Sequence, residues 1–184
     1  PQYLFDLPGL QFPAQLNCAT ELLDKPVAAG HGERLCIQAP GLCWTYADLQ
    51  AQANRIANVL VQDMGLVPGN RVLLRAPNNP MLAACWFAVV KAGGIAVGSM
   101  PLLRAKELAQ IIHKAQVSHA LCDLRLAGEL TLAAATCPEL QHWRCFNDDG
   151  AEGLEAAMAR QPAHFDNVDT AADETCLIAF TSGT

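Results

Sequence analysis

From residue 71 onward the chain alternates short apolar runs with segments of helical pattern, and this alternation constrains the fold more than any other feature. Strands that are separated by a helix pair in parallel through right-handed crossovers. The expected strands are 71–76, 95–98, 117–122, 142–146 and 175–180, and the expected helices between them are 81–90, 104–115, 126–135 and 153–160. The sequence therefore predicts an α/β fold with a doubly wound, mainly parallel sheet and helices on both faces.

Local signals before residue 71 predict a hairpin and a helix. A Pro-Gly pair separates two strand-like runs, 34–39 and 42–46, which predicts a small β-hairpin. Thr45 and Asp48 have the spacing of a capping box, so a helix should begin after Thr45 and end at Gly65. Its apolar stripe is Leu49, Ala53, Ile56, Ala57, Leu60 and Met64.

Three further patterns give structural expectations. Residues 1–20 hold three prolines and no clear period, so we expect an extended arm with a short helix over 17–23. Asn79 followed by Pro80 predicts the start of the next helix. Lys91 lies near the end of that helix, where a cation interacts favourably with the negative end of the helix dipole. We favour this structural role for Lys91 over a role in binding a cofactor.

Composition excludes several classes of function. Of 184 residues, 52% are hydrophobic and 16% charged, so the chain can bury a sizeable core. The net charge of −6, without a basic run, disfavours binding to nucleic acid. No apolar stretch has the length of a membrane span, and the sequence does not open with a signal-peptide pattern. We therefore expect neither nucleic acid nor a membrane as a partner, and a cytoplasmic location.

The cysteines and histidines do not predict a metal site. The eight cysteines form no Cys-x-x-Cys pair, and several, such as Cys85, Cys122 and Cys176, stand in apolar runs. Buried, reduced thiols are therefore the favoured interpretation. The five histidines lack the spacing of a shared metal site. We expect no metal ligand and no catalytic side chain within these 184 residues.

The end of the sequence carries the strongest functional signal. Residues 175–180 form a nearly unbroken apolar run, typical of a strand buried on both faces of a parallel sheet. Thr181, Ser182, Gly183 and Thr184 follow at once and supply hydroxyls and a row of backbone N–H groups. Phosphate oxygens accept from such groups, and open α/β sheets bind nucleotides just past the carboxyl ends of their strands. The alternative is an ordinary polar turn, because four such residues recur by chance.

Three ordered stretches resemble motifs of one enzyme family. Phe180-Thr-Ser-Gly-Thr184 is similar to the opening of the phosphate-binding signature of the adenylate-forming family, which includes acyl-CoA and aryl-CoA synthetases, luciferases and peptide-synthetase adenylation domains. Trp44-Thr-Tyr-Ala-Asp-Leu49 resembles its first core motif, and Val90-Lys-Ala-Gly-Gly-Ile95, running on to Pro101, resembles its second. Neither a Walker A loop nor a Gly-x-Gly-x-x-Gly loop after a strand occurs. The chain is identified on these motifs as a member of the family.

The resemblance implies a substrate set and a site. Thr181, Ser182, Gly183 and Thr184 would bind the β- and γ-phosphates of ATP while a carboxylate attacks the α-phosphate, with Mg²⁺ and CoA as the other participants. The runs 75–80, 100–104 and 119–123 look most like the 2-aminobenzoate and benzoate CoA ligases. The parent would thus be an ATP-dependent, AMP-forming acid–CoA ligase. Two alternatives stay open: a ligase for an aliphatic acid, and a non-catalytic α/β module that binds a nucleotide or a protein.

The resemblance also implies a domain organisation. Residues 1–184 would form the N-terminal portion of the AMP-binding domain. The acid pocket, the Mg²⁺ and ribose ligands, the catalytic lysine and the mobile C-terminal domain would then lie beyond Thr184. We accordingly expect the 184-residue chain to be inactive by itself, and a homodimer is one expected assembly.

Overall fold

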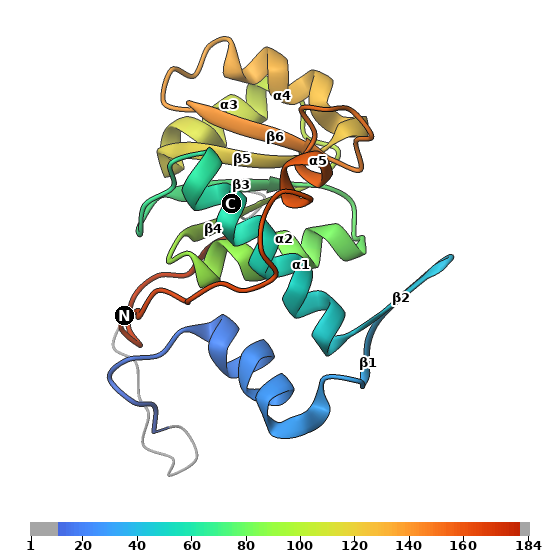
Figure 1. The fold of residues 1–184 in the computed structure, drawn as a ribbon. Helices are drawn as coiled ribbons and strands as arrows, with labels where there is room; N and C mark the ends of the chain where they lie inside the picture. Colours follow the sequence, from blue (N-terminus) through green and yellow to red (C-terminus); the bar gives the residue numbers. More distant parts are fainter. Residues whose placement is uncertain (1–10, 181–184) are drawn as a thin grey trace.

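The computed structural model describes residues 11–180, whose centre is a five-stranded parallel sheet (Figure 1). The strands are β3 (Arg71–Arg75), β4 (Ile95–Ser99), β5 (Val117–Asp123), β6 (His142–Phe146) and β7 (Leu177–Ile178). Their order across the sheet is β6-β5-β3-β4-β7, and every neighbouring pair is parallel. The predicted parallel sheet is therefore confirmed, with β3 at its centre.

Helices cover both faces of this sheet, as predicted. One face packs against α1 (Tyr46–Asn58), α2 (Pro80–Lys91) and α5 (Leu154–Met158), and the other against α3 (Ala105–Ala115) and α4 (Ala127–Ala134). The alternation of side chains along β3 serves both layers, because Val72 and Leu74 join the first hydrophobic cluster and Leu73 joins the second. The sheet thus has two separate cores.

The local signals set the ends of the predicted hairpin and helices. Strands β1 (Leu35–Ala39) and β2 (Leu42–Thr45) form the antiparallel hairpin, which stands away from the sheet in Figure 1. Thr45 and Asp48 make the full capping box at the start of α1. All six residues of the expected α1 stripe are buried, and the π-helical segment η4 (Val59–Asp63) continues the helix towards Gly65. Asn79 accepts from the Leu82 N–H at 2.9 Å and so caps α2.

The N-terminal helix is longer than the sequence indicated. Residues 18–31 are helical and include the π-helical segments η2 (Thr20–Asp24) and η3 (Val27–His31), whereas we expected only a short helix over 17–23. Pro26 lies inside this helical run, directly before η3. Before this helix, the Leu16 N–H donates to the Thr170 carbonyl at 2.8 Å, which holds residues 11–17, here called the arm, against a distant part of the chain.

Lys91 corrects a second expectation. Its side chain is only 1% exposed, and its Nζ lies 2.6 Å from both carboxylate oxygens of Asp24 and 3.2 Å from the Asn167 side-chain oxygen. Burial lowers the pKa of Lys91, and the contact with Asp24 opposes that shift. Lys91 therefore fastens the N-terminal helix to the end of α2 through an ion pair, rather than serving only the helix dipole.

The last strand, β7, also differs from what the sequence predicted. β7 has two residues, and its pairing with β4 through Ala96↔Leu177 and Val97↔Ile178 places it at the edge of the sheet. Leu177 is 49% exposed, so the apolar run 175–180 is not buried on both faces as the sequence suggested. Its parallel direction nevertheless agrees with the prediction. No helix within residues 11–180 is long and apolar enough to cross a membrane.

Gly93 provides a test of how the chain packs beside the sheet. It has φ of +70°, and a Cβ added there would lie 2.9 Å from Cγ1 of Val168, whose N–H is bonded to the Lys91 carbonyl. We predict that Gly93→Ala lowers the free energy of unfolding by about 3 kcal/mol, because left-handed strain and overpacking add. Gly41→Ala, with φ of +75° and nothing within 4 Å, should cost only about 1 kcal/mol. Urea unfolding measures both, and equal losses would contradict the packing argument.

Candidate functional site

The carboxyl ends of the parallel strands all lie at the same end of the sheet, here called the carboxyl edge. Open α/β sheets bind ligands at this end. Strands β3, β4 and β5 end there in Arg75, Ser99 and Asp123. In register, Arg75 lies opposite Ser99 on β4 and opposite Cys122 on β5. Polar residues therefore gather at this edge although the strands themselves are apolar.

Arg75 organises the loop after β4. Its side chain is 1% exposed, and its guanidinium donates to four backbone carbonyls. The acceptors are the carbonyls of Met100 at 3.2 Å, Pro101 at 3.2 Å, Leu103 at 2.8 Å and Leu126 at 3.3 Å. Burial lowers the pKa of Arg75, yet a guanidinium starts so high that it stays charged at neutral pH. This residue therefore acts as an anchor for the β4–α3 loop.

Asp123 organises the loops after β5 and β6. It is fully buried, and its carboxylate accepts from Arg125 Nη2 at 2.7 Å, Asn147 Nδ2 at 2.8 Å and Asn79 Nδ2 at 3.2 Å. The hydrogen bonds from Arg125 hold the pKa of Asp123 below its ordinary value, and the bond from Asn147 adds to this. Asn147 has φ of 53°, a left-handed conformation that this contact holds in place. One carboxylate thus joins three chain segments at the edge.

Sequence patterns alone did not indicate a role for Arg75, Asp123 or Asn147. A usable signal was present, because Arg75 and Asp123 are charged residues at the carboxyl ends of otherwise apolar strands. Their side chains are occupied by protein partners, so they shape the edge instead of presenting donors to a ligand. Within residues 11–180, no group of three or more His, Cys, Asp or Glu side chains could hold a metal ion.

The predicted phosphate-binding residues, Thr181, Ser182, Gly183 and Thr184, lie outside the described residues. The described chain leads up to them. The Ala96 N–H donates to the Cys176 carbonyl at 2.9 Å, and β7 then runs parallel to β4. A parallel β7 carries the chain towards the carboxyl edge, the same end of the sheet as Arg75 and Ser99.

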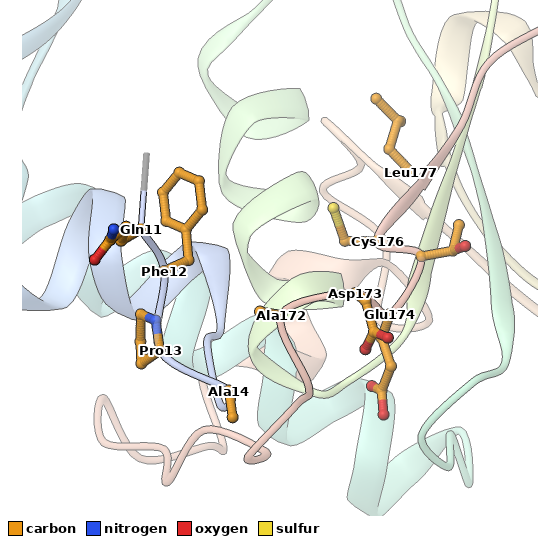
Figure 2. A pocket seen from close by; sticks show the side chains of 10 residues that line it. Gln11, Phe12, Pro13, Ala14, Ala172, Asp173, Glu174, Cys176 and Leu177 are labelled. Atoms are coloured by element: carbon orange, nitrogen blue, oxygen red, sulfur yellow. The ribbon is translucent and has the colours of Figure 1, made fainter. Parts of the chain in front are cut away.

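A cavity lies elsewhere, beside the amino end of β7. Its volume is about 780 Å³, and Figure 2 shows Phe12 and Pro13 of the arm on one side with Asp173 to Leu177 on the other. Two carboxylates, those of Asp173 and Glu174, belong to its lining. These charges disfavour an anionic ligand, so this groove is not the phosphate site that the sequence predicts.

Comparison with known proteins identifies the family. The profile described as "AMP-binding enzyme" matches residues 25–184. The mouse (Mus musculus) protein "Acyl-coenzyme A synthetase ACSM5, mitochondrial" is 30% identical over 145 residues, which is 77% of this chain and 25% of that protein. "Benzoate--CoA ligase" of Thauera aromatica is 22% identical over 176 residues, which is 96% of this chain and 33% of that protein. The chain belongs to the AMP-binding enzyme family.

A solved structure shares the fold. The anthranilate CoA ligase AuaEII in complex with anthranoyl-AMP superposes with a TM-score of 0.86 at 20% identity. The match covers 94% of this chain and 32% of that one. The chain therefore spans about a third or less of the length of the proteins that it matches.

The Asp123 cluster gives a pH-dependent prediction. Asp123→Asn should lower the free energy of unfolding at pH 7 by about 2–3 kcal/mol, the usual cost of lost hydrogen bonds to a charged group. The folded pKa of Asp123 lies below the unfolded value of about 4, so its stabilisation is complete above pH 4 and is lost as the pH falls through the folded pKa.

Denaturant unfolding of both proteins between pH 7 and pH 2 tests this prediction. The difference in the free energy of unfolding between the wild type and Asp123→Asn should become smaller at acidic pH. Asp166→Asn is the matched control, because that carboxylate is 96% exposed and should change stability little at any pH. If the loss of unfolding free energy in Asp123→Asn is the same at every pH, the assigned contacts of Asp123 are contradicted.

Proposed function

We propose that the full-length protein containing this chain is an ATP-dependent, AMP-forming carboxylic acid–CoA ligase, and that residues 1–184 are the N-terminal portion of its AMP-binding domain. One observation carries the proposal: β7 runs parallel to β4 and so heads towards the carboxyl edge, and Thr181–Thr184 follow it in the sequence. Family membership over residues 25–184 supports it.

Thr181, Ser182, Gly183 and Thr184 would bind the β- and γ-phosphates of ATP through N–H groups and hydroxyls. The substrate carboxylate attacks the α-phosphorus and pyrophosphate leaves, which gives an acyl-adenylate. The CoA thiol then attacks the acyl carbon and AMP leaves. The task of the phosphate loop is to hold and neutralise the leaving pyrophosphate, because a hydroxyl without an adjacent base is not an activated nucleophile.

Mg²⁺ is expected from the family, but the described residues do not fit it. The buried carboxylate of Asp123 already accepts from Arg125, Asn79 and Asn147. Residues 11–180 offer no ligand cluster for a metal. The contribution of this part of the chain is to position the phosphate loop.

For the acid, we propose benzoate or 2-aminobenzoate. The resemblance of the runs 75–80, 100–104 and 119–123 supports this choice. So do the names of two relatives, a benzoate–CoA ligase and a ligase crystallised with anthranoyl-AMP, the adenylate of 2-aminobenzoate. An aliphatic acid is the competing choice, since another relative is named an acyl-coenzyme A synthetase. We also propose a cytoplasmic location, no nucleic-acid or membrane partner, and a homodimer as one assembly to test.

The substrate proposal predicts a rate pattern. With ATP and CoA, the full-length protein should release pyrophosphate at least about tenfold faster with benzoate or 2-aminobenzoate than with hexanoate. A tenfold ratio corresponds to a difference of about 1.4 kcal/mol in how the acid pocket stabilises the two transition states. The 184-residue chain should show no turnover above the no-enzyme background, because the catalytic lysine and the acid pocket that the family resemblance implies would lie beyond Thr184. Preference for hexanoate would overturn the aryl assignment, and turnover by the short chain would overturn the domain proposal.

The phosphate-loop proposal predicts a specific loss. Ser182→Ala and Thr184→Ala in the full-length protein should each lower kcat/KM for ATP by about 10- to 1000-fold, as the removal of one preorganised donor does. The control is Thr131→Ala, because the Thr131 hydroxyl lies on the exposed face of α4 and donates to the Ala127 carbonyl at 3.0 Å. Steady-state kinetics with varied ATP measures the effect. Equal rates for all three variants would contradict the loop assignment.

A further inference from the structure

Two cysteines that are far apart in the sequence, Cys18 and Cys176, line one cavity near the amino end of β7, away from the carboxyl edge. Cys18 follows the arm at the start of the N-terminal helix, and Cys176 directly precedes β7. Both line the same small cavity, which has a volume of about 90 Å³. Both are half-buried, so a small oxidant can reach them.

The backbone on each side of the pair is held firmly. Asn17 is buried, and its Nδ2 donates to the carbonyls of Val90 at 2.9 Å and Val168 at 3.0 Å. Its side-chain oxygen accepts from the Ala19 N–H at 3.0 Å, so the residues on both sides of Cys18 are fixed. On the other side, the Cys176 carbonyl accepts from the Ala96 N–H at 2.9 Å. The backbone next to Cys18 and Cys176 is therefore held in place on both sides of the cavity.

We propose that Cys18 and Cys176 are a reversible redox pair whose disulfide links the arm to β7. Hydrogen peroxide is the oxidant: one thiolate attacks a peroxide oxygen to give a sulfenic acid and water. The second thiol then attacks that sulfur and releases a second water. Two thiols and one peroxide thus become one disulfide and two waters, and a dithiol reductant restores the thiols.

The reaction has a pH requirement. Burial raises the pKa of Cys18, the neighbouring Cys176 raises it further, and Glu21 adds a smaller contribution in the same direction. The carboxylate of Glu174 also belongs to the cavity wall. Little thiolate is therefore present at neutral pH, and oxidation should be faster at pH 8.5 than at pH 7.

The sheet core supplies an internal control pair. Cys122 on β5 and Cys145 on β6 lie directly opposite in register, so these two thiols are also close in space. Both are buried, and burial raises the pKa of Cys122 to about 12. Proximity alone therefore does not select the pair that reacts. The reactive pair should be the one that solvent reaches.

This proposal does not depend on the ligase proposal, because its readout is a covalent link and not turnover. The full-length protein is treated with hydrogen peroxide at pH 8.5, remaining thiols are alkylated, and disulfide-linked peptides are mapped by mass spectrometry. The expected product joins Cys18 to Cys176 and disappears with dithiothreitol. The oxidised protein should melt roughly 5–10 °C higher than the reduced protein, because the bond closes a loop of nearly the whole described chain.

Matched variants make the test specific. Cys18→Ser and Cys176→Ser should each abolish the link and the shift in melting temperature, whereas Cys43→Ser, at an exposed thiol on β2, should leave both unchanged. In the wild type, absence of the Cys18–Cys176 peptide would overturn the proposal. So would a Cys122–Cys145 link that forms first.

Discussion

The fold depends on the burial of the central strand β3 on both faces. Val72 and Leu74 face one core and Leu73 faces the other, so helices must cover both sides of the sheet. Two covered faces require parallel strands with helical crossovers, and parallel strands deliver all their carboxyl ends to one edge. The shared position of these strand ends is thus a consequence of how the apolar residues of the strands are buried.

That edge would not be ordered without buried polar anchors. Loops cannot leave their carbonyls unpaired next to a dry core, and Arg75 donates to four of them. Asp123 holds two asparagine side chains in the same way. At the other end of the molecule, the Lys91–Asp24 ion pair fastens the N-terminal helix. Each anchor joins segments far apart in the sequence, which keeps the chain before β7 in place.

The sequence predicted the features that depend on neighbouring residues. The capping box of Thr45 and Asp48 and the Asn79 cap each involve residues three apart, and apolar periodicity predicted the sheet. It did not predict the roles of Lys91, Arg75 and Asp123, because each contacts a distant segment: Lys91 binds Asp24, 67 residues away, Arg75 binds the Leu103 carbonyl, 28 away, and Asp123 binds Asn147, 24 away. It also missed the exposure of β7, since an apolar run does not show how many neighbouring strands will cover it. For the phosphate site, motif resemblance identified the family, while the roles of Thr181–Thr184 remain predictions.

We propose that the carboxyl edge presents Thr181–Thr184 to the phosphates of ATP. A crystal structure of the full-length protein with a non-hydrolysable ATP analogue would test this placement. The β- and γ-phosphate oxygens should lie within about 3 Å of backbone N–H groups and hydroxyls of these residues. Phosphates bound in the groove between Phe12 and Glu174, or anywhere away from the carboxyl ends of β3 and β4, would contradict it.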